Sequence, residues 1–329
     1  MKVLFNSEQL NFRGTTNSIM EYARYNQEIL GNESAIIYNS KNGIGIDVSS
    51  EQSVVETVSK LYPVYTYETE KELNDIAEKF DFCYSQRSGV LNDPIEKKKQ
   101  YVVTSTKFGV HCVFQWYEPH GDRYAYISEW LAHATAKMHN SKVYPHVPYV
   151  VNLPEPNENY REKFGISKDK LVIGRIGGYN TFDLGFVQNV VRKIARDRDD
   201  ILFIFANTRP FTDSPNVIYA ESFFDPQVKS NYIHMCDAML HGRNLGESFG
   251  LSVAEFLFHN KPVLTWEGGF DRNHVEMLKN TGLIYGNDED NLYEMIVSLR
   301  ERPTCYYKGI VEKYNPTTVM QQFKSVFLD

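Results

Sequence analysis

The sequence predicts an α/β protein with two domains, each built on a parallel β-sheet covered by helices. The chain has 329 residues, which is typical of about two domains. Short apolar runs alternate with amphipathic segments, as in consecutive βαβ units. A polar, proline-rich segment at residues 152–159 interrupts this alternation, which then begins again. A domain boundary is therefore expected there.

The first half contains the expected strands and helices of one such sheet. The strands are apolar runs at residues 3–5, 35–38, 80–84, 101–104, 111–115 and 124–128. The helices cover residues 19–30 and 129–137, and the first has Ile19, Ala23 and Leu30 on one face. Strands that alternate with helices pair in parallel, so we expect a doubly wound sheet.

The second half repeats the pattern. Its expected strands are residues 171–176, 201–206, 217–219, 238–240, 262–265 and 283–285. The helix between the first two strands has an apolar face formed by Phe186, Val187, Val190, Val191 and Ile194. A final helix is expected at residues 317–328, with an apolar face of Val319, Phe323, Val326 and Phe327.

The composition is that of a globular protein without strong basic character. Hydrophobic residues make up 42% and charged residues 23%, and the net charge is −7. The chain therefore lacks the global positive field that favours nucleic-acid binding. No stretch approaches the ~20 apolar residues of a membrane helix, and the N-terminal MKVLFNSEQL lacks a signal-peptide core. We expect a cytoplasmic protein.

The sequence offers no metal-binding pattern. Its cysteines, Cys83, Cys112, Cys236 and Cys305, lack zinc-ligand spacing, and we expect all four to be reduced and buried. The acidic runs at residues 197–199 and 288–290 are expected to be surface acids. The first strand is followed by no G-x-G-x-x-G motif, which disfavours a nicotinamide-dependent dehydrogenase.

Residues 241–269 carry the densest pattern of potential site residues. The expected strand at residues 238–240 leads into a loop with Arg243 and Glu247, and a helix is expected at residues 251–259. A strand, a loop and a helix in this order present backbone N–H groups at the start of the helix. An anionic group binds favourably at such a place.

This stretch resembles the donor-site signature of the large retaining glycosyltransferase family 4, whose members have the GT-B fold. The signature has two glutamates separated by seven residues, a Phe-Gly-Leu between them and a later Pro-Val. The matching residues are Glu247, Phe249, Gly250, Leu251, Glu255, Pro262 and Val263. The resemblance covers the C-terminal domain well and the N-terminal domain more loosely.

The resemblance implies two Rossmann-like domains that face each other across a cleft. It implies an acceptor domain of residues 1–152, a donor domain of residues 153–310, and a helix in residues 311–329 that packs back towards the N-terminal domain. The implied activity moves a sugar from a nucleotide-diphosphate sugar, UDP- or GDP-linked, to an acceptor hydroxyl. Retention at the anomeric carbon and independence of metal are also implied, and the donor is a substrate, so no separate cofactor is expected.

The two glutamates are expected to have different roles. On a single helix, eight residues would separate them by about 12 Å. This exceeds the carboxylate separations of glycoside hydrolases, roughly 5–9.5 Å. In the family, the earlier acid lies beside the transferred sugar and the later acid binds the ribose, which implies these roles for Glu247 and Glu255. The structural alternative for Glu255 is a capping box with Ser252.

Phosphate binding is expected at the start of the helix and at arginines. Phe249, Gly250 and Leu251 begin the helix, where a glycine allows close approach and the helix dipole favours negative charge.

Arg175 matches the family arginine that holds the diphosphate. The family lysine that follows it is absent, since Asn180-Thr181 stands there. Arg209 and Arg243 follow other strands and are the candidate replacements, although a surface position is an equal alternative for Arg209.

Three loops of the first half follow expected strands. The loop with Gly14 joins the first strand to the first helix, and the resemblance implies contact with donor phosphate or acceptor; a capped turn is the alternative. Residues 86–89 open on the same edge. Residues 116–121 combine aromatic, acidic and imidazole side chains, which suits an acceptor-sugar pocket. His120 is the candidate for the cleft histidine of the family, with a structural role as the alternative.

Three other interpretations remain open at this stage. One is a non-catalytic GT-B relative that binds nucleotide or glycan, which the missing lysine motivates. Another is a sugar-nucleotide epimerase, which shares the fold. The third is a transferase that acts on nucleic acid. The base and sugar of the donor, the acceptor and the oligomeric state are not given by the sequence.

Overall fold

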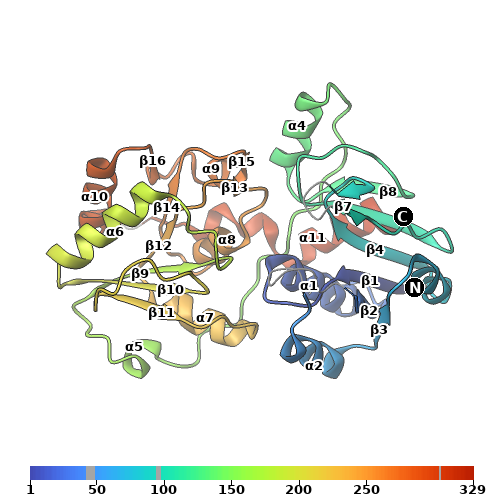
Figure 1. The fold of residues 1–329 in the computed structure, drawn as a ribbon, viewed down its shortest axis with the longest axis horizontal. Helices are drawn as coiled ribbons and strands as arrows, with labels where there is room; N and C mark the ends of the chain where they lie inside the picture. Colours follow the sequence, from blue (N-terminus) through green and yellow to red (C-terminus); the bar gives the residue numbers. More distant parts are fainter. Residues whose placement is uncertain (42–48, 94–97, 304) are drawn as a thin grey trace. The chain divides into compact units, whose positions relative to one another are not determined.

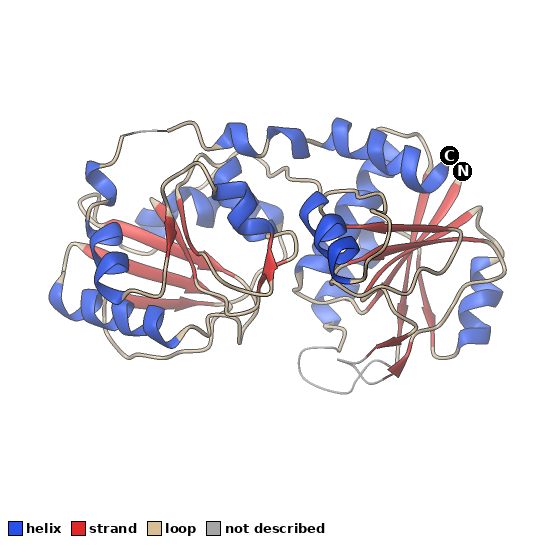
Figure 2. Cartoon of the chain, turned by 90° about the horizontal axis from the view of Figure 1, so that it is seen from above, coloured by secondary structure: helices blue, strands red, loops and turns tan. Residues whose placement is uncertain are grey.

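The computed structural model describes residues 1–41, 49–93, 98–303 and 305–329 (Figure 1). The chain forms two compact units. The first contains Met1–Val150 together with Tyr314–Asp329, and the second contains Val151–Lys313. Each unit has a six-stranded parallel sheet. Figure 2 shows helices on both faces of the sheets.

The sheet of the first unit has the strand order β3-β2-β1-β4-β7-β8. All its pairings are parallel. Its strands are β1 (Lys2–Glu8), β2 (Glu33–Asn39), β3 (Val64–Tyr67), β4 (Phe82–Arg87), β7 (Lys107–Cys112) and β8 (Arg123–Tyr126). Its helices are α1 (Gly14–Glu28), α2 (Gln52–Leu61), α3 (Glu70–Ala77) and α4 (Glu129–Met138). A short pair, β5 (Asn92–Asp93) and β6 (Lys98–Lys99), lies outside this sheet.

The sheet of the second unit has the equivalent order β11-β10-β9-β12-β14-β16. Its strands are β9 (Leu171–Ile176), β10 (Ile201–Ala206), β11 (Val217–Ala220), β12 (Ala238–His241), β14 (Val263–Trp266) and β16 (Ile284–Tyr285). Its helices are α5 (Tyr160–Lys163), α6 (Gly185–Asp197), α7 (Pro226–Met235), α8 (Leu251–Phe258), α9 (Asn273–Leu278) and α10 (Glu289–Val297), followed by short 3₁₀ turns at Leu299–Glu301, Lys308–Ile310 and Glu312–Tyr314. A separate pair joins β13 (Gly246–Glu247) to β15 (Asp271–Arg272).

In both sheets the first strand lies in the middle and the fourth strand lies beside it. The chain therefore winds outward in opposite directions from this central pair. Open α/β sheets of this order bind ligands at the carboxyl ends of such a central pair, where the following loops turn to opposite faces. The prediction of parallel-sheet α/β domains is confirmed. A ligand-binding site is expected at the carboxyl ends of the central pair of strands in each sheet.

The last helix belongs to the core of the first unit. Helix α11 (Pro316–Phe323) continues into a π-helical turn, Lys324–Leu328, and packs against α1. In Figure 1 it is drawn in red among the blue and green elements of this unit. The Phe323 ring is fully buried, with its centroid 5.1 Å from that of Tyr22 and 5.2 Å from that of Tyr84. An aromatic cluster thus ties the end of the chain to its first strand and helix.

Two strand predictions in the first unit are wrong. Residues 101–104 form no strand. Strand β4 already has β1 and β7 as its neighbours, so the run is excluded from the sheet there. Instead, the backbone N–H of Val102 donates to Glu70 at 2.9 Å and that of Thr104 donates to Asn74 at 2.7 Å. Side chains of α3 thus bind the backbone N–H groups of a segment whose composition is typical of a strand.

The strand expected at residues 111–115 begins earlier, at Lys107. Gly109 interrupts the apolar pattern at the start of β7, and a glycine is not typical of the interior of a strand. It is required here, since a Cβ at this position would lie 2.5 Å from the Phe82 ring. The segment from α2 to α3 was missed because it buries few apolar side chains, with only Val54 and Val58 buried in α2.

Cys305 is exposed, which corrects the expectation that all four cysteines are buried; it lies in a loop beyond the last sheet strand.

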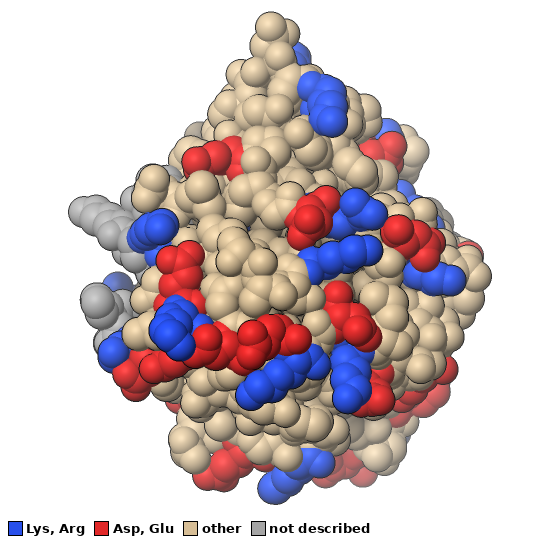
Figure 3. All heavy atoms as spheres, turned by 90° about the vertical axis from the view of Figure 1, so that its right-hand side faces the viewer, with Lys and Arg blue, Asp and Glu red and all other residues tan. Residues whose placement is uncertain are grey.

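On the face drawn in Figure 3, Lys and Arg lie among Asp and Glu. Across the part of the chain that the structure describes, no helix has the length and apolar character needed to cross a membrane.

The Phe323 cluster predicts a specific loss of stability. Phe323→Ala should lower the free energy of unfolding of the first unit by ~3–5 kcal/mol, because it removes a buried ring and leaves a cavity. Urea denaturation followed by circular dichroism measures this loss. Phe164→Ala is the matched control because Phe164 is 40% exposed. A loss below about 1 kcal/mol for Phe323→Ala would show that the final helix adds little to the core.

Candidate functional site

The site of the second unit lies where β9 and β12 end side by side. Arg175 is close to the end of β9, and His241 is the last residue of β12. Thr265, on β14, pairs with His241 across the sheet. The carboxyl ends of parallel strands meet at one edge, so these polar residues gather at the carboxyl edge of the central strands.

A tight turn brings Glu247 to this edge. Gly246 and Glu247 form β13, which pairs with Asp271 and Arg272 of β15. Gly246 has φ +76°, and a Cβ there would lie 1.9 Å from the backbone oxygen of Asp271. Only glycine fits at this position, because it needs both a left-handed backbone and no side chain. Glu247 therefore lies in a strand before the helix, and the separation estimated for one helix does not apply.

Both carboxylate oxygens of Glu247 are occupied. Oε1 lies 3.3 Å from Nε2 of His241, and Oε2 accepts from Nη1 of Arg243 at 3.0 Å. Partial burial acts to raise the pKa of Glu247, but Arg243, His241 and His274 overcome it and hold the pKa well below its ordinary value. Glu247 is thus ionised at neutral pH, and Arg243 is its ion-pair partner.

His241 and His274 fix the position of this glutamate. Nδ1 of His274 accepts from the backbone N–H of Glu247 at 3.2 Å, and Nε2 donates to the backbone oxygen of Trp266 at 3.2 Å. One nitrogen accepts and the other donates, so His274 is neutral. Burial also favours the neutral ring, since it lowers the pKa of His274 to about 3. His241 is held through Nδ1, 2.8 Å from Oγ1 of Thr265.

Helix α8 starts next to this turn. Its N-cap is Gly250, with φ +88°, a residue that has no side chain to cap the first N–H groups of the helix. Leu251 is the first helical residue, and the Phe249 side chain is buried beneath it. Ser252 is inside the helix, so the capping-box alternative for Glu255 does not hold. The uncapped N–H groups and the helix dipole form a favourable place for an anion.

Glu255 lies one turn further along α8 and is buried. Its Oε1 accepts from Nζ of Lys229 at 2.7 Å, and both side chains are 7% exposed. Lys229 comes from α7, so two helices contribute to this pair. The sequence pattern identified Glu255 but gave no sign of its partner.

Arg175 is buried beneath a loop that wraps over its guanidinium. Nη2 donates to Thr181 Oγ1 at 2.7 Å and to the Gly178 oxygen at 3.2 Å, and Nη1 donates to Thr208. Burial lowers the pKa of Arg175 to about 10, and the charge of Glu247 acts against this shift. Thr181, at the place of the missing lysine, therefore serves to orient Arg175.

Arg209 is exposed, and its backbone N–H donates to the Tyr179 oxygen at 2.8 Å, which joins two loops at this edge. The structure thus brings Arg175, Arg243 and Glu247 into one electrostatic group beside the start of α8. Arg209 lies on the rim of that group. Among the residues that the structure describes, no group of three or more His, Cys, Asp and Glu could hold a metal ion.

The first unit has its own polar cluster at the equivalent edge. Arg87, the last residue of β4, is buried and donates to Glu8 Oε1 at 2.9 Å and to the Tyr101 oxygen at 2.8 Å. Glu8, at the end of β1, has φ +56°, a strained conformation for a residue with a side chain. Gly14 is the first residue of α1. The sequence indicated residues 86–89 here but missed Glu8.

His120 lies in a partly buried loop of the first unit. Its Nδ1 donates to the Glu118 oxygen at 2.7 Å, and burial lowers the pKa of His120. Its Nε2 is buried with no hydrogen-bond partner among the described residues. Glu118 accepts from the N–H of Leu91 at 2.7 Å, which closes this loop onto its neighbour. His120 is therefore a neutral ring with one acceptor nitrogen unused.

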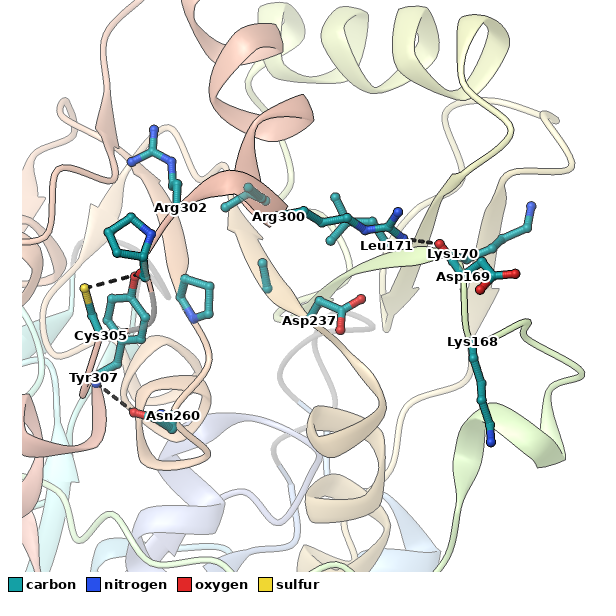
Figure 4. A pocket seen from close by; sticks show the side chains of 14 residues that line it. Lys168, Asp169, Lys170, Leu171, Asp237, Asn260, Arg300, Arg302, Cys305 and Tyr307 are labelled. Carbon is teal, nitrogen blue, oxygen red and sulfur yellow. Dashed lines mark hydrogen bonds between the residues drawn. The ribbon is translucent and has the colours of Figure 1, made fainter.

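A pocket of about 560 Å³ lies at the opposite, amino edge of the second sheet (Figure 4). Leu171 and Ala238, which begin β9 and β12, are among its lining residues. Two of its charged side chains have partners in the protein: Asp237 pairs with Arg161 at 2.7 Å, and Arg300 donates to the Asp169 oxygen. This hollow is separate from the carboxyl-edge site.

The fold is that of the GT-B glycosyltransferases. The chain is similar to Anabaena Alr3699/HepE in complex with UDP-glucose, with a TM-score of 0.73 and 11% identity over 99% of this chain and 98% of that one. It is similar to a glycosyltransferase from Rickettsia africae ESF-5, with a TM-score of 0.64 and 15% identity over 98% and 94%. WaaG, a glycosyltransferase involved in lipopolysaccharide biosynthesis, gives a TM-score of 0.61 and 12% identity over 99% and 98%. No family model and no curated protein matches the sequence.

The clash at Gly246 predicts that this turn tolerates no side chain. Gly246→Ala should destabilise the second unit by at least ~2 kcal/mol, because it adds a backbone clash to the cost of a left-handed alanine. Thermal and urea unfolding measure the loss. Gly282→Ala is the matched control, since Gly282 has φ +67° and open space around a Cβ. Equal losses for the two variants would contradict the steric argument.

The depressed pKa of Glu247 predicts a pH-dependent contribution to stability. The unfolded carboxyl titrates near 4.5 and the folded one lower, so the contribution is complete above pH ~4.5 and disappears as the pH falls through the folded pKa. Glu247→Gln should cost about 1–3 kcal/mol at pH 7, given that the side chain is 23% exposed, and less at pH 3.

Urea titrations at several pH values test this, with Glu294→Gln as the control for removing an exposed charge from the same unit. A difference between wild type and Glu247→Gln that stays constant from pH 7 to pH 3 would contradict the assignment.

Proposed function

We propose that this chain is a retaining glycosyltransferase of the family 4 type. It transfers a sugar from a UDP- or GDP-linked donor to an acceptor hydroxyl, and it needs no metal ion. The observation that carries the proposal is the cluster of Arg175, Arg243 and ionised Glu247 beside the uncapped start of α8. The likeness in fold to HepE, which was solved with UDP-glucose, supports a nucleotide-sugar donor.

The charges suit a donor with a diphosphate leaving group. Arg175, oriented by Thr181, and the N–H groups of Gly250 and Leu251 supply positive charge for the phosphates. Arg243 supplies a second cation at the same edge, in place of the family lysine. Glu255 is assigned to the ribose hydroxyls.

Glu247 acts through its charge. Its two oxygens are held by Arg243 and His241, so it would have to give up an ion pair to become a nucleophile or a general base. Beside the sugar, its negative charge stabilises the positive charge that develops at the anomeric carbon in the transition state. The bond from the anomeric carbon to the leaving phosphate oxygen breaks as the acceptor oxygen bonds on the same face. The acceptor proton passes to the leaving phosphate.

The acceptor is assigned to the first unit. His120, with its unused Nε2, and the Glu8–Arg87 pair offer acceptor and donor groups for a polyhydroxylated molecule. A carbohydrate, or another molecule with a hydroxyl group, fits this chemistry.

Donor turnover tests the proposal. Wild type incubated with UDP-glucose, UDP-galactose and GDP-mannose should release nucleoside diphosphate by transfer or slow hydrolysis. Glu247→Ala and Arg175→Lys should each lower kcat by at least about 100-fold, since each removes transition-state stabilisation. Proton NMR of the product should show the anomeric configuration of the donor. Glu294→Gln is the control, with unchanged turnover.

The alternatives give other outcomes. Turnover that survives both substitutions would refute the assigned roles. Binding of a nucleotide sugar without any turnover would favour a non-catalytic protein. Formation of an epimeric nucleotide sugar without an acceptor would favour an epimerase. An inverted product would refute retention.

A further inference from the structure

Lys229 is a buried lysine of α7 whose amine is paired with Glu255 of α8. Its Nζ lies 2.7 Å from Oε1 of Glu255, and both side chains are only 7% exposed. Lysine is almost never fully buried unless it is paired. The pair joins α7 to α8, and each helix begins at the carboxyl edge of the second sheet, after β11 and β13 respectively.

Both residues lie near the starts of their helices. Lys229 is the fourth residue of α7 and Glu255 is the fifth residue of α8. Both helices run back from the carboxyl edge, so the pair lies about one helical turn below the edge at which Arg175 and Glu247 lie. It therefore belongs to the wall of the proposed donor site.

Stability does not explain this pair. Burying two charges removes their hydration, and apolar side chains of similar volume would pack between two helices at least as well. What the ion pair does provide is orientation. With Oε1 held 2.7 Å from Nζ of Lys229, the carboxylate plane of Glu255 is fixed in one direction.

We propose that Lys229 is a positioning residue for nucleotide recognition: it holds Glu255 so that this carboxylate accepts hydrogen bonds from the 2′- and 3′-hydroxyls of the donor's ribose. This inference rests on the proposed function. Discrimination between ribose and deoxyribose at this site is then a property of the pair, and Lys229 fills a role that the motif alone leaves unassigned.

Isothermal titration with UDP and 2′-deoxy-UDP tests the proposal, with GDP and 2′-deoxy-GDP used if wild type prefers guanine. Wild type should bind the ribonucleotide about tenfold or more tightly, because the deoxy form loses a hydrogen bond to a charged group. Lys229→Met should weaken UDP binding by about 10- to 100-fold and bring the two affinities close to equality. Lys229→Arg, which keeps the charge, should retain part of the discrimination.

Lys261→Met is the matched control. Lys261 is another partly buried lysine of this unit, with its Nζ 3.1 Å from the His234 oxygen, and it precedes β14 at the other edge of the sheet. Its replacement should leave the ratio of the two affinities unchanged. If Lys229→Met does not fold, Lys229→Gln replaces it, because a neutral amide retains a hydrogen bond to Glu255 and should still lower the ratio.

The nucleotide-binding results distinguish a failure of the role proposed for Lys229 from a failure of the proposed function. A wild-type ratio that persists in the folded Lys229 variants overturns the positioning role. If wild type binds UDP and 2′-deoxy-UDP equally, the assignment of Glu255 to the ribose hydroxyls is wrong, whereas the proposal of a nucleotide-sugar donor still stands. If no nucleoside diphosphate binds wild type, the proposed function itself fails.

Discussion

The structure depends on the parallel order of its strands. In each unit the first and fourth strands lie side by side at the centre of the sheet, and the chain winds away from them in opposite directions. Parallel pairing forces every connection to cross over the sheet, so all the carboxyl ends gather at one edge. Arg175, His241 and Thr265 are far apart in sequence and meet only for this reason.

Charged and polar neighbours then determine the ionisation and the orientation of Glu247 at this edge. Burial favours the protonated form of a carboxylate, yet Glu247 is held ionised by Arg243 and oriented by two histidines. His274 binds only the backbone, with one nitrogen as acceptor and the other as donor. The protein's own contacts therefore organise this candidate site, and under the proposed function its charges would lower a barrier at little cost of reorganisation.

Backbone conformation is the second requirement at the site. Gly246 has a left-handed conformation and no room for a Cβ, and Gly250 begins α8 with a left-handed backbone. In the first unit, Glu8 adopts a positive φ although it carries a side chain, and it pairs with the buried Arg87. Strained or glycine-dependent positions thus occur at the same edge in both units, where a ligand would approach the backbone.

The sequence by itself determined the α/β class and the second sheet, because strands such as residues 201–206 and 217–219 are apolar runs bounded by polar segments. It also singled out Glu247 and Glu255 as candidate site residues, because the motif that contains them is local in the sequence. Only the tertiary structure decided that residues 101–104 lie outside the sheet, since a strand position depends on its neighbours. It alone paired Lys229 with Glu255, placed His241 and His274 on Glu247, and assigned Thr181 to Arg175. These contacts join separate elements, and the hydrophobic pattern of one segment carries no information about the partner it will meet.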